Sequence, residues 1–89
     1  MTIPQTDLDQ AARYLRYAWE LLEREAFGEP ARLRKTLLVA ARRLSQGDHL
    51  IGNAAAEITV LRKIAEKVPV AAARTEILKA VAVLRDKGR

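Results

Sequence analysis

Apolar residues recur along the chain at the three- and four-residue intervals of an α-helix, and they fall into four segments. The first segment covers residues 6–27. It opens with Thr6 as a candidate helix cap and closes before Gly28 and Pro30, which are typical of a boundary between two helices. Its apolar positions share one helix face: Leu8, Ala11, Ala12, Leu15, Ala18, Trp19, Leu22 and Ala26. We therefore expect an amphipathic helix here.

Two further helices are predicted on either side of Gly47. The helix over 30–46 is expected to bury Leu33, Leu37, Ala40, Ala41 and Leu44. The next helix is expected to begin at the cap Asp48, to end near Val68, and to bury Leu50, Ala54, Ile58, Leu61, Ala65 and Val68. Because the connections are short, consecutive helices should lie antiparallel.

Pro69 leaves two paths open for the rest of the chain. The residue before a proline avoids the α region, so we predict that one helix ends at Val68 and another begins at Pro69 after a sharp corner. The alternative is one long helix from Leu50 to Lys87 that is kinked at Pro69. The fourth helix would bury Val70, Ala73, Ile77, Ala80, Val81 and Leu84.

These segments predict an all-α fold, a compact antiparallel bundle of four helices, because no segment alternates as a strand would. The 89 residues fit a single domain over 1–89, with 1–5 and 86–89 expected to fray. A core this thin favours self-association, and we expect a homodimer. The sequence has no cysteine, no apolar run near the roughly 20 residues of a membrane span, and no secretory signal pattern, so we expect a cytoplasmic protein.

Positive charge is concentrated in the second predicted helix. The formal net charge is +5 at pH 7, yet residues 1–29 hold three bases and six acids, whereas residues 30–47 hold five bases and no acid. At roughly 100° per residue, four bases share the face opposite the apolar stripe: Arg32, Lys35, Arg42 and Arg43. We predict that this face binds a polyanionic partner, DNA or RNA first, through backbone phosphates and without sequence readout. The alternative is a solvated face that the acidic first helix balances.

Apolar residues outside the buried stripes form a candidate protein interface: Tyr14, Tyr17, Leu21, Leu38 and Val39. The strip on the first helix could contact a second neighbouring helix, form a homodimer seam, or stack on bases. It also supports an alternative function, in which the chain is an adaptor or inhibitor that docks one specific protein and no nucleic acid.

Evidence for catalysis is weak in this sequence. Arg43 and His49, the only histidine, have an R-x5-H spacing that resembles the short motif of HEPN-type helical ribonucleases, which would imply RNA cleavage. Gly47 is expected to interrupt the helix between them, and no metal, phosphate-loop or nucleophile motif accompanies them. We therefore expect a non-enzymatic regulatory or binding module without cofactor, metal or small-molecule substrate.

Glu57 is the one acid that falls at the edge of a buried face. A buried carboxylate needs a partner, so we expect an ion pair with an arginine such as Arg43 or Arg74. The alternatives are a side chain that reaches out to solvent or a small polar site.

Overall fold

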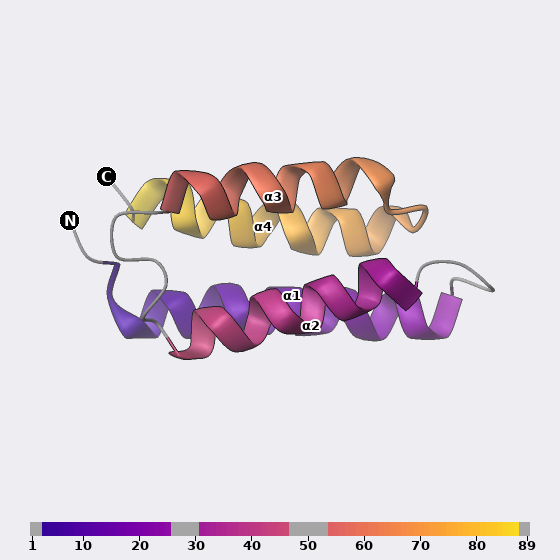
Figure 1. Cartoon of the computed structure of the whole chain (residues 1–89), viewed down its shortest axis with the longest axis horizontal. Coiled ribbons are helices and arrows are strands. Elements are labelled where there is room, and N and C mark those ends of the chain that lie inside the picture. The colour runs from indigo at the N-terminus through magenta and orange to yellow at the C-terminus, as the bar shows by residue number, and fades with distance from the viewer. Residues whose placement is uncertain (1–2, 26–30, 47–53, 88–89) are drawn as a thin grey trace.

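Four α-helices make up the computed structural model, which describes residues 3–25, 31–46 and 54–87. They are α1 (Gln5–Glu25), α2 (Ala31–Gln46), α3 (Ala54–Lys67) and α4 (Ala71–Lys87). No strand occurs in these residues, and none of the helices, over the same residues, is long and apolar enough to cross a membrane. The predicted all-α bundle of antiparallel helices is confirmed (Figure 1).

The helices form two antiparallel hairpins, α1 with α2 and α3 with α4 (Figure 1). The hairpins are joined mainly by close packing of α1 against α4, so α1 contacts two neighbours. Across the described residues, α2 and α3 are not among the closely packed pairs. The start of α1 and the end of α4 lie at the same end of the bundle (Figure 1).

The predicted apolar stripes form the core. The largest fully buried side chains come from all four helices: Leu15, Leu22, Leu37, Leu44, Leu61, Ile77, Leu84 and Val68 at the end of α3. Four predicted members, Trp19, Leu33, Ile58 and Val70, are only half-buried and pack against the edge of this core. Asp48, Leu50, Ala26 and the side chain of Ala54 lie outside the described part of the chain.

Val68, Pro69 and Val70 separate α3 from α4, so the corner is confirmed and the long kinked helix is excluded. Helix α4 begins at Ala71 rather than at Pro69, because the Val70 carbonyl accepts the first helical bond from the Arg74 backbone N–H at 3.0 Å. The Arg74 guanidinium also donates to the Val68 carbonyl at 2.9 Å, which satisfies an acceptor at the end of α3.

Helix α1 begins at Gln5, before the predicted cap Thr6. The Pro4 carbonyl accepts the backbone N–H groups of Asp7 at 3.0 Å and Leu8 at 3.1 Å, so the backbone of Pro4 closes the first turn. Thr6 is therefore an exposed residue inside the helix and does not cap it.

The start of the chain is tied to the end of α2. Ile3, in the stretch expected to fray, is buried in the core at 5% exposure. The Gln5 side-chain amide donates to the Ser45 carbonyl at 2.9 Å and more weakly to the Leu44 carbonyl at 3.4 Å. Arg16 adds a hydrogen bond to the Ser45 hydroxyl at 3.2 Å. These bonds satisfy acceptors in the last turn of α2 and hold it against α1.

Candidate binding site: a groove between α2 and α3

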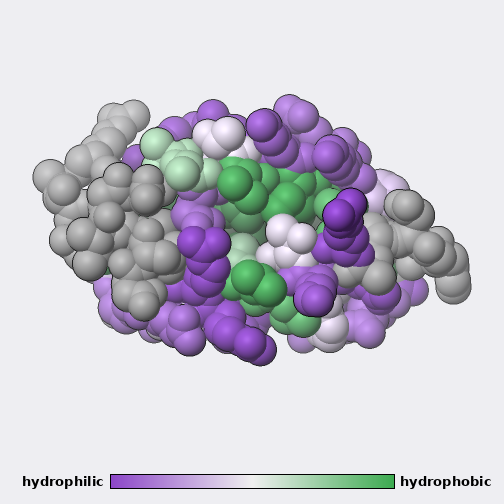
Figure 2. Space-filling model, in the orientation of Figure 1, coloured by the Kyte–Doolittle hydropathy of each residue, from purple (hydrophilic) through white to green (hydrophobic). Residues whose placement is uncertain are grey.

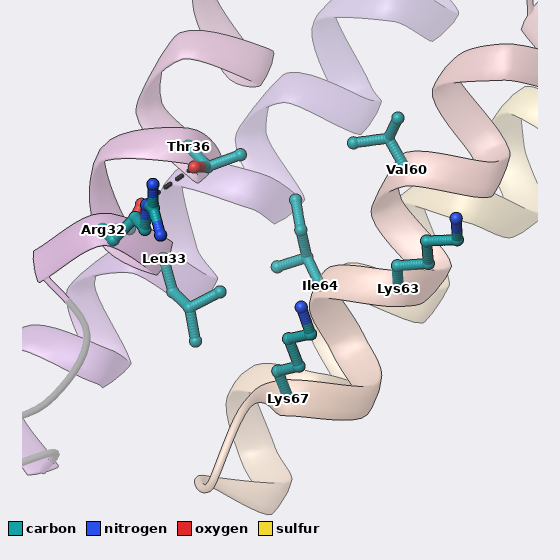
Figure 3. Close-up of a pocket in the computed structure, with 7 residues that line it drawn as sticks. All are labelled: Arg32, Leu33, Thr36, Val60, Lys63, Ile64 and Lys67. Carbon is teal, nitrogen blue, oxygen red and sulfur yellow. Dashed lines mark hydrogen bonds between the residues drawn. The ribbon is translucent and has the colours of Figure 1, made fainter.

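The loosely packed side of the bundle carries a surface cavity of about 320 Å³, at the lower end of the range of ligand sites. It lies between the first two turns of α2 and the second half of α3 (Figure 3). We call it the α2–α3 groove, and its lining residues are Arg32, Leu33, Thr36, Val60, Lys63, Ile64 and Lys67.

The floor of the groove is apolar. Leu33 of α2 and Ile64 of α3 extend into the space between the two helices, and Val60 lies one turn from Ile64 (Figure 3). Ile64 is 6% exposed, Leu33 is half-buried and Val60 is 47% exposed, so apolar surface increases toward solvent. Figure 2 shows apolar residues gathered in the middle of this face, between hydrophilic surfaces above and below.

The rim of the groove is cationic. It carries Arg32 on α2 and Lys63 and Lys67 on α3, and no described lining residue is acidic. Lys67 points from α3 into the gap, whereas Lys63 lies along the outer surface of α3 (Figure 3). The Thr36 hydroxyl donates to the Arg32 carbonyl at 2.8 Å, so it is satisfied within its own helix. Like charges on both walls, with no carboxylate between them, disfavour closure of the two helices here.

The four predicted anion-binding residues all lie on the exposed surface of α2: Arg32, Lys35, Arg42 and Arg43. Arg32 also lines the groove, so this face borders it. Within the described chain, Arg32, Lys35 and Arg42 form no ion pair.

Acidic α1 does not neutralise this face in the described residues. The ion pair from α1 to α2 joins Glu23 to Arg34, at a long 3.9 Å, and Arg34 is not one of the four predicted residues. No described acid of α1 forms an ion pair with Arg32, Lys35 or Arg42, and these three side chains are exposed to solvent.

Arg43 differs from the other three because it pairs with Glu57. The Arg43 guanidinium lies 3.2 Å from a Glu57 carboxylate oxygen, and Glu57 is the one buried charged residue of the described chain, at 8% exposure. The predicted pairing of Glu57 with an arginine is confirmed for Arg43, whereas Arg74 serves the corner after α3. This pair bridges α2 and α3 at the opposite end from the groove. Because the Arg43 side chain is half-exposed, its contribution to stability is about 1 kcal/mol or less.

Lys63 and Lys67 were not grouped with the α2 cations by sequence analysis. A helical wheel places Lys63 on an outer face, but it does not show that α3 lies opposite α2 and antiparallel to it. The available signal is the spacing of Val60, Lys63 and Lys67, which puts an apolar residue and two cations on one face of α3.

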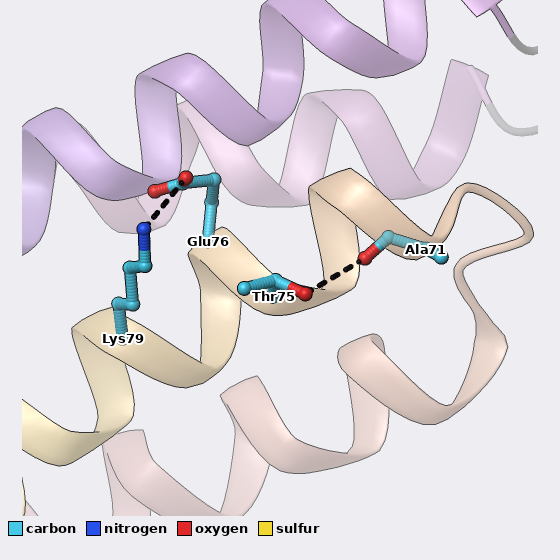
Figure 4. Close-up of polar contacts among 4 residues, drawn as sticks. All are labelled: Ala71, Thr75, Glu76 and Lys79. Atoms are coloured by element: carbon cyan, nitrogen blue, oxygen red, sulfur yellow. Dashed lines mark hydrogen bonds and ion pairs between the residues drawn. The ribbon is translucent and has the colours of Figure 1, made fainter.

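Of the three predicted interface residues on α1, two pack inside the protein and one, Tyr17, is exposed to solvent. Tyr14 and Leu21 are half-buried and pack against the core, which supports the contact with a second neighbouring helix. The Lys79 ammonium of α4 lies 5.9 Å from the centre of the Tyr14 ring and pairs with Glu76 at 3.1 Å (Figure 4). Tyr17 is 48% exposed.

Figure 4 also shows polar side chains on two different sides of α4. Glu76 and Lys79 are directed toward α1, whereas the Thr75 hydroxyl donates back to the Ala71 carbonyl at 3.1 Å within α4. The Glu76–Lys79 pair is within α4, and Lys79 also contacts α1 through the Tyr14 ring.

Leu38 and Val39 are exposed on α2, at 38% and 47%, and neither lines the groove. As sequence neighbours they point about 100° apart, so they do not form one patch. Val39 shares the cationic face with Lys35 and Arg42, at intervals of four and three residues.

The described residues contain no group of three or more potential metal ligands. His49 lies outside them, so the predicted spacing of Arg43 and His49 has no described geometry. Comparison of the chain with models of known protein families, with curated proteins and with solved structures finds no match.

Proposed function

We propose that this chain is a small non-enzymatic binding module that docks a polyanionic partner on the cationic surfaces of α2 and α3. One observation carries the proposal: both helices that border the open groove carry exposed cations, of which Arg32, Lys63 and Lys67 line the groove. Lys35 and Arg42 extend the exposed cationic surface along α2. Within the described chain none of these cations is in an ion pair.

The physical reason is the mutual repulsion of these cations. A cluster of like charges on one face creates a field that raises the local concentration of anions. A polyanion that neutralises several of the cations releases its own condensed counterions, which supplies binding free energy that decreases as salt rises. Among the described acids, Glu23 pairs with Arg34 and Glu76 with Lys79, so neither carboxylate pairs with these cations.

Nucleic acid is the first polyanion to test, because its phosphates present charge at regular spacing. Contacts would be to the backbone, since the exposed lysines and arginines of these surfaces are the side chains that commonly bind phosphates.

The test is fluorescence anisotropy with labelled duplex DNA and duplex RNA across a salt series. With three or four phosphates contacted, the slope of log K against log salt should be about −3 to −4. Replacing Arg32, Lys35 and Arg42 with Gln should lower the affinity at least about tenfold at 50 mM salt and flatten the slope by about three.

The matched control replaces Arg13, Arg24 and Arg85 with Gln. These arginines are exposed on α1 and α4, so the net charge changes equally while the cationic face is intact. Circular dichroism should be unchanged in both triple variants. Absence of wild-type binding to either duplex and to poly-glutamate at about 50 mM salt would reject the proposal.

A further inference from the structure

A polyanion alone leaves the apolar floor of the groove unexplained. A phosphate backbone binds through charge and hydrogen bonds and offers little apolar surface to cover Val60 and Leu33. Val60 is 47% exposed although it lies on the inner side of the gap between α2 and α3. A ligand that fits this groove needs an apolar surface as well as negative charge.

The dimensions of the groove suit a helix. Its α3 wall runs from Val60 to Lys67, about 10 Å or two turns at 1.5 Å per residue. The α2 wall is shorter, from Arg32 to Thr36, about 6 Å or one turn. An amphipathic helix laid along such a groove places apolar side chains at i, i+3 or i+4, and i+7 on the floor.

The cations at the edges of the groove determine the charge that such a helix must carry. Arg32 borders the floor on one side and Lys63 and Lys67 on the other, with no acid among the described lining residues. A helix seated between them would therefore carry carboxylates on both flanks of its apolar stripe. We infer that the α2–α3 groove binds an acidic amphipathic α-helix of a partner protein. The inference rests on the proposed function, because the same cations supply the charge. It adds that apolar side chains of the partner helix cover the apolar floor of the groove.

A second copy of this chain fits the groove less well. The acidic helix of the chain is α1, but its apolar stripe is buried in its own core. Its exposed face mixes Glu20 and Glu23 with Arg13 and Arg24. Over the described residues, α1 therefore does not offer an apolar stripe flanked by acids to another molecule.

The probe is a labelled helical peptide of about 14 residues with leucines at i, i+4, i+7 and i+11, glutamates on both flanks of that stripe and alanines elsewhere. Binding is measured by anisotropy at about 50 mM salt with the full chain. One control peptide has the leucines replaced by alanine and another has the glutamates replaced by glutamine. Both controls should bind at least about fivefold more weakly, because each lacks one of the two required features.

Two valines give a matched pair of variants in the protein. Val60 and Val39 are each 47% exposed on a helix, but only Val60 lines the groove. Val60→Ser should weaken peptide binding roughly fivefold, and Val39→Ser less than about twofold. If Val60→Ser loses helical circular dichroism, Val60→Thr keeps the shape of the side chain while adding a hydroxyl, and it should weaken binding in the same direction.

The charges are tested in parallel. Replacing Lys63 and Lys67 with Gln should weaken peptide binding roughly tenfold at low salt. Replacing Arg13 and Arg24 with Gln removes the same charge from the exposed surface of α1 and should have less than about a twofold effect.

The outcomes separate the inference from the proposed function. If the lysine variant loses binding while both valine variants bind as the wild type does, the groove is not occupied and only charge attraction remains. If Val39→Ser is as damaging as Val60→Ser, the peptide lies on the outer face of α2. Binding of duplex nucleic acid without binding of the peptide would make nucleic acid the partner. Each of these three results overturns the inference and leaves the proposed function standing, whereas no binding to either probe overturns both.

Discussion

The boundary between α1 and α4 is closed, whereas the boundary between α2 and α3, on the other side of the bundle, is open. Large side chains such as Tyr14, Leu21 and Val83 pack against the core beside α1 and α4. The cation there, Lys79, is paired with Glu76 at 3.1 Å. At the α2–α3 groove the apolar floor consists of Leu33, Val60 and Ile64, and no described lining residue is acidic. The two boundaries thus differ in how closely the helices pack and in charge pairing.

The α2–α3 boundary itself shows the effect of charge pairing. At one end Arg43 and Glu57 bridge the two helices at 3.2 Å, and at the other end Arg32 faces lysines across an open cavity. Opposite charges favour approach of the helices and like charges oppose it. The position of the groove thus follows the position of the acids, as well as the amount of apolar surface on each helix.

The largest expected effect concerns the closed part of the core. Leu37 is fully buried and Leu33, one turn earlier on α2, is half-buried at the groove. Leu37→Ala should lower the free energy of unfolding by about 3 kcal/mol, and Leu33→Ala by about 1 kcal/mol, because truncation at the open site leaves a smaller new cavity. Urea denaturation followed by circular dichroism measures both. Equal losses would mean that the groove is as tightly packed as the core.

The next effect concerns the bridge that holds α2 to α3. Arg43→Gln should lower the free energy of unfolding by about 1 kcal/mol, whereas Arg42→Gln, its unpaired and exposed neighbour, should change it by less than about 0.5 kcal/mol. The same denaturation experiment compares the two variants. If they were indistinguishable, the Arg43–Glu57 pair would not contribute to holding the helices together.

A smaller change should follow from placing an acid in the groove. Lys63→Glu would put a carboxylate across from Arg32 and beside Lys67, and should raise the free energy of unfolding by about 0.5 kcal/mol at low salt. The gain should vanish at about 1 M salt, where charges are screened. Lys63→Gln serves as the control for simple removal of repulsion. A gain for Lys63→Gln equal to that of Lys63→Glu would assign the effect to repulsion alone.

The smallest effect is expected at Tyr17, on the outer side of α1. Because this side chain is 48% exposed, Tyr17→Ser should change the free energy of unfolding by less than about 0.5 kcal/mol. Light scattering at several protein concentrations gives the mass of each variant in parallel. A loss of stability that grows with concentration, together with a lower mass, would show that Tyr17 is buried between copies and would support the predicted homodimer.

Helical periodicity was sufficient to predict the helices and most of the core. The stripes of Leu15 and Leu22 on α1 and of Ile77 and Leu84 on α4 are buried as predicted, because each helix has one dominant apolar face. The corner at Pro69 was also predictable, since the constraint on the preceding residue is local. Errors occurred at the helix starts: α1 begins at Gln5, before the predicted cap Thr6, and α4 begins at Ala71, after the predicted first residue Pro69.

The groove could not be predicted, because it depends on which helices are neighbours in space. Periodicity assigned Leu33 to a buried stripe, but α3 does not pack closely on α2 over the described residues, and Leu33 is half-buried. Lys63 and Lys67 border the same site as Arg32 only because α2 and α3 are antiparallel across the open side. Separation along the chain contains no direct information about that pairing.

The start of α1 and the end of α4 share the end of the bundle that is farther from the groove (Figure 1). This arrangement allows oriented immobilisation: a linker from either terminus to a sensor surface would direct the groove away from that surface. The Gln5 bonds to Ser45 and Leu44 set the condition that an N-terminal linker leaves residues 3–5 intact. Two such surfaces, one for each terminus, would present the same cationic groove to an added partner.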